Sequence, residues 1–234
     1  MDTSTRFRTI VIGGFALGLA AGATAQTQEA VLTTIEVKRL VQSTQTEDQA
    51  RLRDHFAALA DRYGAEAREH QAMARAFQVN PGRRVAANRA SEHCKRLADL
   101  AARSAETVHA LAAHHGRLAV GMPSTPPDNS ARFEAGEGAE VVWEHDKAIH
   151  DLAANARSAS DHRALEAHFA EIETRYRRAV DEHLAMAQAY RAAPNQRGGD
   201  PAAHCDQLVR LSREAAREAG ALAAEHRHAA DSAR

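Results

Sequence analysis

Hydrophobic residues recur along this chain at alternating steps of four and three positions. Two stretches show the pattern most clearly. One consists of Leu52, Phe56, Leu59, Tyr63, Glu66, His70, Met73 and Phe77, and the other of Leu165, Phe169, Ile172, Tyr176, Ala179, His183, Met186 and Tyr190. Because an α-helix has 3.6 residues per turn, this spacing places each set on one face of a helix. A 3-4 spacing is typical of helices that pack at a small angle in bundles.

The second of these stretches is a copy of the first. The offsets His168−His55, Tyr176−Tyr63, His183−His70 and Met186−Met73 all equal 113. Each stretch is followed by a second matched segment, SEHCKRLADLA from Ser91 and AAHCDQLVRLS from Ala202, for which Cys205−Cys94 equals 111. The difference of two residues falls between the matched segments, where a loop can absorb it. The sequence therefore predicts an internal duplication.

The predicted fold is all-α: an antiparallel four-helix bundle built from two duplicated long helical hairpins, with short accessory helices. We expect long helices over about 47–79, 85–120, 160–192 and 201–230, and short helices over about 29–42 and 140–156. Asn80-Pro81-Gly82 ends the first long helix, because proline cannot continue a helix and glycine accepts a positive φ. Neither hairpin can bury its apolar stripe alone, so the two hairpins should pack together.

The N-terminus has the features of a secretory signal peptide, with Arg6 and Arg8 before a short apolar run and Ala23-Thr24-Ala25 as the cleavage signal. We expect cleavage after about Ala25 and a periplasmic location. Residues 26–234 then form a single domain. Repeat 1 covers about 30–120, a linker rich in proline and glycine covers 121–138, and repeat 2 covers about 139–232.

The charge balance excludes several classes of partner. The formal net charge is −1 for the whole chain, and removal of Arg6, Arg8 and Asp2 with the signal peptide makes it −2. Such a near-neutral balance gives no argument for nucleic acid or for an anionic membrane surface. No membrane span is expected in the mature chain. No P-loop, nucleophile elbow or dinucleotide motif is present, so nothing in the sequence indicates an enzyme.

Histidine carries the candidate chemistry. The chain has 14 histidines, and eight recur at equivalent positions of the repeats: 55/168, 70/183, 93/204 and 115/226. If each hairpin folds about its turn, two histidines, a methionine and a cysteine should gather near that turn. Imidazole, thioether and thiolate are soft donors that suit copper, particularly Cu(I), and then zinc. The predicted metal ligands are His70, Met73, His93 and Cys94 in repeat 1, and His183, Met186, His204 and Cys205 in repeat 2. A second tier of candidates is His55, His115, His168 and His226.

Two alternatives remain open. Cys94 and Cys205 occupy equivalent positions in a protein expected in an oxidising compartment, so a Cys94–Cys205 disulfide could join the hairpins of a metal-free structural or partner-binding bundle. Haem held without covalent attachment by histidine and methionine is also compatible with a bundle. The recurrence of these histidines and methionines does not decide between metal binding and core packing. Duplication of a gene segment copies packing residues as faithfully as it copies metal ligands. The leading hypothesis is an exported bundle that binds copper or zinc for sequestration or delivery, with the protein partner unknown.

Overall fold

The computed structural model describes residues 31–79, 84–122, 144–193 and 200–233. Within these ranges it contains helices and no strand: α1 (Thr34–Val41), α2 (Thr46–Gln78), α3 (Arg84–Ala119), α4 (Glu144–Asn155), α5 (Ala159–Ala192) and α6 (Pro201–Ser232). The all-α prediction is confirmed, and the long helices begin and end within a few residues of the expected positions. The predicted signal peptide and most of the predicted linker lie outside the described residues.

Local sequence explains several of the helix starts. Thr33 and Glu36 form a capping box at α1, and Ser158 and Asp161 form one at α5. The Asp200 side chain accepts a hydrogen bond from the Ala203 N–H at 2.9 Å, at the start of α6. These side chains satisfy backbone N–H groups that have no partner within the helix.

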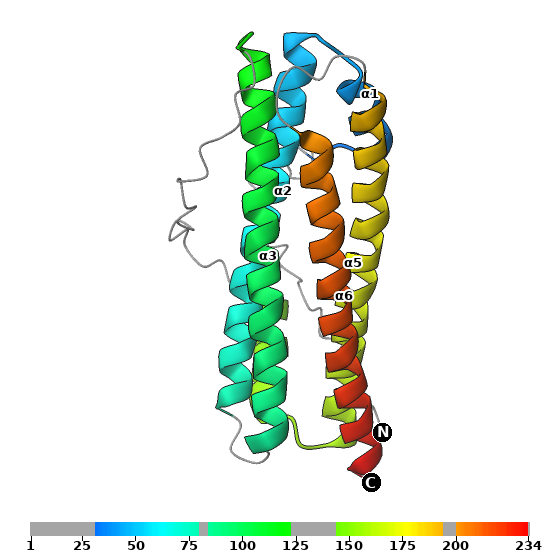
Figure 1. Cartoon of the computed structure of the whole chain (residues 1–234). Helices are drawn as coiled ribbons and strands as arrows, with labels where there is room; N and C mark the ends of the chain where they lie inside the picture. The colour runs from blue at the N-terminus through cyan, green and yellow to red at the C-terminus, as the bar shows by residue number, and fades with distance from the viewer. Residues whose placement is uncertain (1–30, 80–83, 123–143, 194–199, 234) are drawn as a thin grey trace, which may run out of the picture.

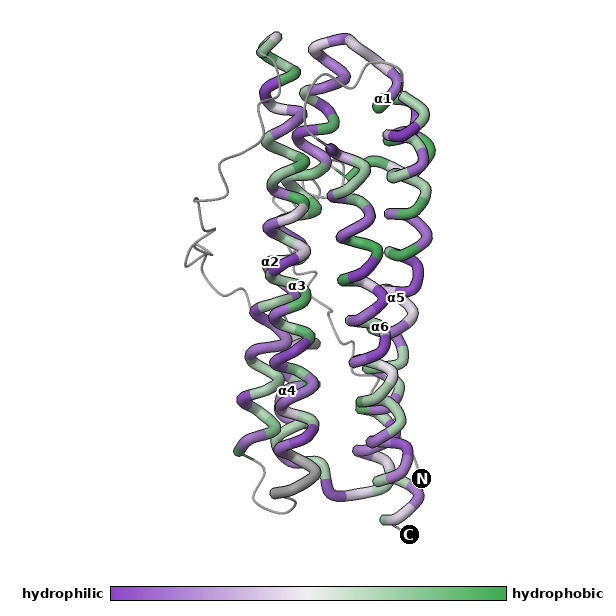
Figure 2. Tube along the Cα trace, viewed as in Figure 1, coloured by the Kyte–Doolittle hydropathy of each residue, from purple (hydrophilic) through white to green (hydrophobic). Residues whose placement is uncertain are grey.

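The apolar stripes form the core of one elongated helical bundle (Figure 1). Every member of the α2 and α5 stripes is buried except Glu66 and its counterpart Ala179, which are half-buried. The corresponding stripes of α3 and α6 are also buried; they consist of Cys94, Leu97, Ala101, Ser104, Val108, Leu111 and His115 in α3, and of Cys205, Leu208, Ser212, Ala215, Ala219, Leu222 and His226 in α6. Hydrophilic and hydrophobic residues alternate along each long helix (Figure 2).

The long helices pack unevenly. α2 packs along α3, α5 packs along α6, and α3 contacts α6, whereas no Cα atom of α2 lies within 8 Å of one in α5. Side-chain size explains the difference, because the distance between packed helices depends on the residues at their contact. The buried faces of α3 and α6 are rich in alanine and contain no phenylalanine or tyrosine, while the stripes of α2 and α5 carry phenylalanine, tyrosine and methionine. The short helices α1 and α4 each contact both α2 and α5 and so bridge them.

Candidate functional site

The space between α2 and α5 contains a cavity of about 770 Å³. Its long walls come from α2 and α5, residues 31–34 and Val37 close one part of it, and His150 of α4 reaches it from the other short helix. The cavity follows directly from the packing: α2 and α5 are held apart, and the short helices fill only part of the gap. A volume of this size lies within the range of about 300–1,000 Å³ that is usual for small-molecule and cofactor sites.

Several residues at equivalent positions of the two repeats line this cavity, one from α2 and one from α5. Both members of the pairs Arg62/Arg175, Tyr63/Tyr176 and Glu69/Glu182 line it. Both repeats therefore contribute an arginine, a tyrosine and a glutamate to the cavity. Tyr63 and Tyr176 are buried, as their places in the hydrophobic stripes predict.

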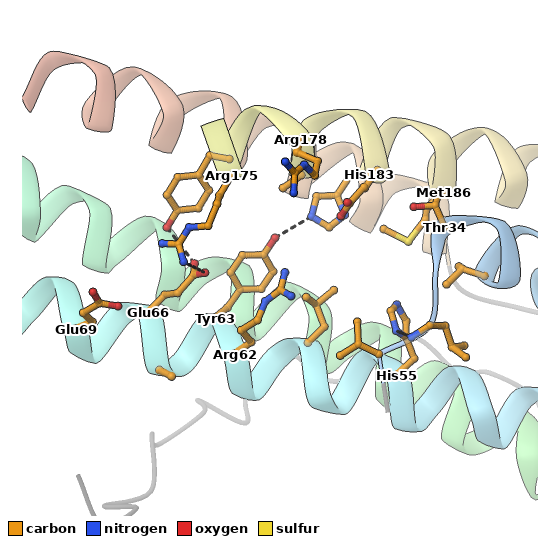
Figure 3. Close-up of a pocket in the computed structure, with 18 of the residues that line it drawn as sticks. Thr34, His55, Arg62, Tyr63, Glu66, Glu69, Arg175, Arg178, His183 and Met186 are labelled. Atoms are coloured by element: carbon orange, nitrogen blue, oxygen red, sulfur yellow. Dashed lines mark hydrogen bonds and ion pairs between the residues drawn. The ribbon is translucent and has the colours of Figure 1, made fainter. Parts of the chain in front are cut away.

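A buried hydrogen bond links the walls. The Tyr63 hydroxyl of α2 lies 2.9 Å from Nε2 of His183 on α5 (Figure 3). Nδ1 of His183 is buried and has no hydrogen-bond partner among the described residues. Burial lowers the pKa of His183 to about 4, with smaller contributions from the charges of Arg62 and His55. The imidazole is therefore neutral near pH 7, which is the form that binds a metal ion.

The hydrogen bond equivalent to Tyr63–His183 is absent from the other half of the cavity. By analogy with Tyr63 and His183, Tyr176 would bond to His70, but the Tyr176 hydroxyl instead donates to Glu66 Oε2 at 3.2 Å. Arg175 lies 4.0 Å from the other oxygen of Glu66. Nε2 of His70 is left buried without a hydrogen-bond partner among the described residues. Burial lowers the pKa of His70 to about 3, so this imidazole is neutral as well.

His55 lines the same cavity but has a defined tautomer. Its Nδ1 accepts a hydrogen bond from the Leu32 backbone N–H at 2.9 Å. In a neutral imidazole only one nitrogen accepts, so Nε2 carries the hydrogen. Burial lowers the pKa of His55 to about 4, which keeps the ring neutral. His55 is thus a hydrogen-bond donor toward the cavity rather than a free acceptor, and it also ties the start of α1 to α2.

Two of the other second-tier histidines belong to aromatic layers in the core. His115 lies 2.7 Å from Gln49 Oε1 through Nδ1 and 2.7 Å from the Tyr190 hydroxyl through Nε2. The amide oxygen can only accept, so Nδ1 of His115 donates and Nε2 accepts. Both ring nitrogens are used, and the ring stacks on Phe56 at a centroid distance of 5.4 Å. His115 therefore has no free nitrogen for a metal ion in this arrangement.

The corresponding layer around His226 is less complete. His226 Nδ1 lies 3.1 Å from Nδ1 of His162, which stands at the position of Gln49. Phe77 replaces Tyr190 and stacks on the imidazole at 5.6 Å. Nε2 of His226 is buried without a hydrogen-bond partner in the described part of the chain. The fourth second-tier residue, His168, makes an edge contact with Phe169 at 5.2 Å.

His93 contacts α6, not the hairpin site predicted for it. Its Nδ1 lies 2.6 Å from Glu218 Oε2, and Arg96 donates to the same oxygen at 2.8 Å. The physical reason is rotational: His93 precedes the stripe residue Cys94 by one position, which turns its side chain about 100° around the helix. Its counterpart His204 is half-buried, and burial lowers its pKa.

Cys94 and Cys205 are both buried free thiols, so the structure does not contain the disulfide that the sequence allowed. Burial raises the pKa of both thiols, that of Cys205 to about 12. Neither residue lines the cavity. Over residues 31–79, 84–122, 144–193 and 200–233, no group of three or more His, Cys, Asp or Glu side chains is arranged to hold a metal ion.

Of the predicted first-tier ligands, only His183 and Met186 line the cavity, and both come from α5 (Figure 3). The sequence interpretation missed Arg62, Arg175, Arg178 and Glu66, which lie on the same walls. One signal could have identified the site: Glu66 is the only charged residue in the stripes of α2 and α5, and its counterpart is Ala179.

Comparison of the chain with protein-family models, with curated proteins and with solved structures found no match. In the part of the chain that is described, no helix is both long and apolar enough to cross a membrane.

Proposed function

We propose that this chain is an exported, duplicated, antiparallel four-helix bundle that binds a transition-metal ion, copper before zinc, for sequestration or delivery. The contacts between aromatic rings support the duplication. Phe56 stacks on His115 at 5.4 Å, and the equivalent pair, Phe169 and His226, stacks at 5.7 Å. In Figure 1 the two helices of each packed pair, α2 with α3, α5 with α6 and α3 with α6, run in opposite directions, which supports the antiparallel arrangement. The signal-like N-terminus supports export to the periplasm.

One observation carries the metal proposal. Each repeat has a histidine followed three residues later by a methionine, and each histidine has a buried ring nitrogen without a hydrogen-bond partner among the described residues. These pairs are His70 with Met73 and His183 with Met186. Residues three apart lie side by side on a helix. A buried polar atom without a partner costs free energy, and a metal ion bound by that nitrogen would remove this cost.

The donor types favour copper. Neutral imidazole and thioether suit Cu(I), whereas zinc usually takes four ligands from cysteine, histidine and carboxylate. The raised thiol pKa values of Cys94 and Cys205 disfavour thiolate donors. We therefore place the primary site at His183 and Met186, which line the cavity. His70 and Met73 form a second, enclosed site of the same type.

The cavity volume of about 770 Å³ favours haem as a second candidate. A bare ion would fill little of this space, while a cofactor of haem size needs a cavity within the usual range for such sites. His183 and Met186 are side chains of the types that hold haem iron. An absorption band near 400 nm in the protein isolated from haem-sufficient cells would support this candidate over a bare ion.

Metal content tests the primary proposal. The protein is isolated from the periplasm of cells supplemented with copper and zinc, and its metals are measured by elemental analysis. We expect near-stoichiometric copper in the unaltered protein and a large loss in a His70→Ala/His183→Ala double variant. His93→Ala is the matched control: it removes a predicted ligand that contacts Glu218 instead, so its copper content should be unchanged. A folded protein without metal, judged by its helical circular dichroism, would exclude the proposal.

The metal-free, disulfide-linked alternative is tested on the same material. Titration of thiols after unfolding without reductant should find two per chain, as the structure has them. A titration that finds none, together with an absence of metal, would favour the structural or partner-binding bundle.

A further inference from the structure

The cavity between α2 and α5 has an apolar end next to α1, called here the α1 end. The apolar side chains that line it are Leu32, Val37, Leu59 and Met186. In Figure 3, Met186 and His55 lie toward one end of the view, beside the start of α1. The charged residues Glu66, Glu69 and Arg175 lie toward the other end (Figure 3). The α1 end is therefore separate from the most highly charged part of the cavity.

The register of α2 and α5 brings the apolar walls to the same level as His55. The two helices run in opposite directions, as the hydrogen bonds between them show. Met186 comes three residues after His183, so it faces a position about three residues before Tyr63, next to Leu59. His55 precedes Leu59 by about one helical turn and lies on the same face of α2.

His55 supplies a buried donor at the α1 end. Its Nδ1 accepts from the Leu32 N–H, so Nε2 carries the hydrogen. The residue is only 4% exposed, and Nε2 makes no hydrogen bond within the described part of the chain. The ring lines the cavity, and in Figure 3 it points from α2 toward the side on which Met186 lies. A buried N–H without a partner costs free energy, which a ligand with an acceptor would recover.

We propose that the α1 end binds an uncharged, largely apolar molecule whose carbonyl oxygen accepts the hydrogen of His55 Nε2. A carbonyl oxygen accepts without bringing a donor of its own, so it matches a site that offers an N–H. The imidazole is neutral and supplies no charge to offset the burial of an ionised group. The apolar walls cover the rest of the molecule, as is usual for small-molecule sites. This ligand is additional to the proposed metal ion, and its binding does not require the metal.

Binding of 2-acetylnaphthalene tests the proposal, with 2-ethylnaphthalene as the probe of similar shape that lacks the carbonyl. Calorimetry on the full exported protein should show saturable binding of 2-acetylnaphthalene. Because the probes differ in hydrophobicity, the ratio of their affinities is compared between protein variants. His55→Phe should lower the affinity for 2-acetylnaphthalene relative to 2-ethylnaphthalene by about tenfold, since the carbonyl loses its donor. Any general loosening of the α1 end would affect both probes alike.

His168→Phe is the matched control. His168 stands at the position equivalent to His55 in the other repeat, and it does not line the cavity. The same substitution there should leave the affinity ratio unchanged.

Nuclear magnetic resonance of the unaltered protein gives a second readout that needs no variant. The His55 Nε2–H signal should move more with 2-acetylnaphthalene than with 2-ethylnaphthalene, since only the ketone supplies an acceptor. Overhauser contacts should join the probe to the Met186 methyl group. An absence of saturable 2-acetylnaphthalene binding, an unchanged ratio in His55→Phe, or an equal response of the His55 signal to both probes would overturn the proposal. Binding of the anion 2-naphthoate at least as tightly as the ketone would overturn the assignment to an uncharged ligand.

Parallel Cu(I) titrations separate this inference from the metal proposal. His55→Phe should retain Cu(I) binding, and His183→Ala should lose Cu(I) while it still prefers the ketone. A protein that binds 2-acetylnaphthalene through His55 but binds no Cu(I) would exclude the metal site and leave the carbonyl site standing. The reverse result would exclude the carbonyl site alone.

Discussion

Glu66 decides how the two halves of the cavity differ. Its carboxylate accepts the Tyr176 hydroxyl, while the counterpart Ala179 leaves Tyr63 free to bond with His183. Because of this one substitution between repeats, His183 has a tyrosine partner at Nε2 and His70 has none. The sequence shows this difference, because the stripe of α2 has Glu66 where the stripe of α5 has Ala179. Its effect could not be predicted, since periodicity does not show which side chains bond across helices.

Removal of the Glu66 carboxylate should restore the missing bond. In Glu66→Ala the Tyr176 hydroxyl loses its acceptor, and we expect it to bond with Nε2 of His70 as Tyr63 bonds with His183. The ¹⁵N chemical shifts of the His70 ring should then move toward those of His183. The His183 signals in the same spectrum serve as the internal control. Unchanged His70 signals would show that the asymmetry has another cause.

The tautomer of His55 is the second residue-scale finding. The sequence placed His55 among secondary metal ligands because it recurs as His168. The structure instead uses Nδ1 to accept from the Leu32 backbone, and this contact comes from a segment preceding α1. No pattern within the repeated segment itself identifies that contact.

At the scale of the elements, the helix bounds, the buried faces and the packing of α2 with α3 and of α5 with α6 were predictable, but the contacts between these two pairs were not. The 3-4 stripes correctly predicted that Leu52 and Leu165 are buried, and the structure leaves neither side chain exposed. The same spacing occurs in all the long helices, so it could not show that α3 and α6 approach closely while α2 and α5 remain apart. The smaller volume of the buried residues in α3 and α6 was the sequence feature that indicated their closer approach. The prediction for His93 considered only its distance from the hairpin turn along the helix. It did not consider rotation about the helix axis, which turns His93 toward Glu218 of α6.

The aromatic layers that connect the helices give a matched pair of predictions. Tyr190 of α5 bonds to Nε2 of His115 in α3, whereas Phe77 leaves the equivalent nitrogen of His226 without a partner among the described residues. Tyr190→Phe should lower the free energy of unfolding by about 1–3 kcal/mol, because a buried acceptor loses its donor. Phe77→Tyr should raise it by about 0.5–1.5 kcal/mol, because a hydroxyl is supplied. Urea unfolding measures both, and effects of the same sign would contradict the equivalence of the layers.

At the scale of the whole molecule, buried neutral histidines make stability depend on pH. Burial lowers the pKa below the ordinary value of 6.5, to about 4 or below, in His55, His70, His114, His183 and His226. Between these values the unfolded chain binds protons that the folded chain does not, so stability rises with pH. The contribution is fully present above about pH 6.5 and is lost as the pH falls toward about 4.

We therefore expect the free energy of unfolding to fall by several kcal/mol between about pH 7 and pH 4, since one pKa unit corresponds to about 1.4 kcal/mol per group. Urea unfolding across this range measures the change. His183→Phe should flatten the profile, because it removes one of the titrating groups. A profile that is level down to pH 4 would show that these imidazoles are not held neutral by burial.

The most direct test of the metal proposal is X-ray absorption at the copper edge of the Cu(I)-loaded protein. The proposed site predicts imidazole nitrogen together with one thioether sulfur around copper, and loss of the sulfur signal in Met186→Leu. Retention of sulfur in that variant, with its loss on substitution of Cys94 or Cys205, would place copper at the cysteines and contradict the site between α2 and α5.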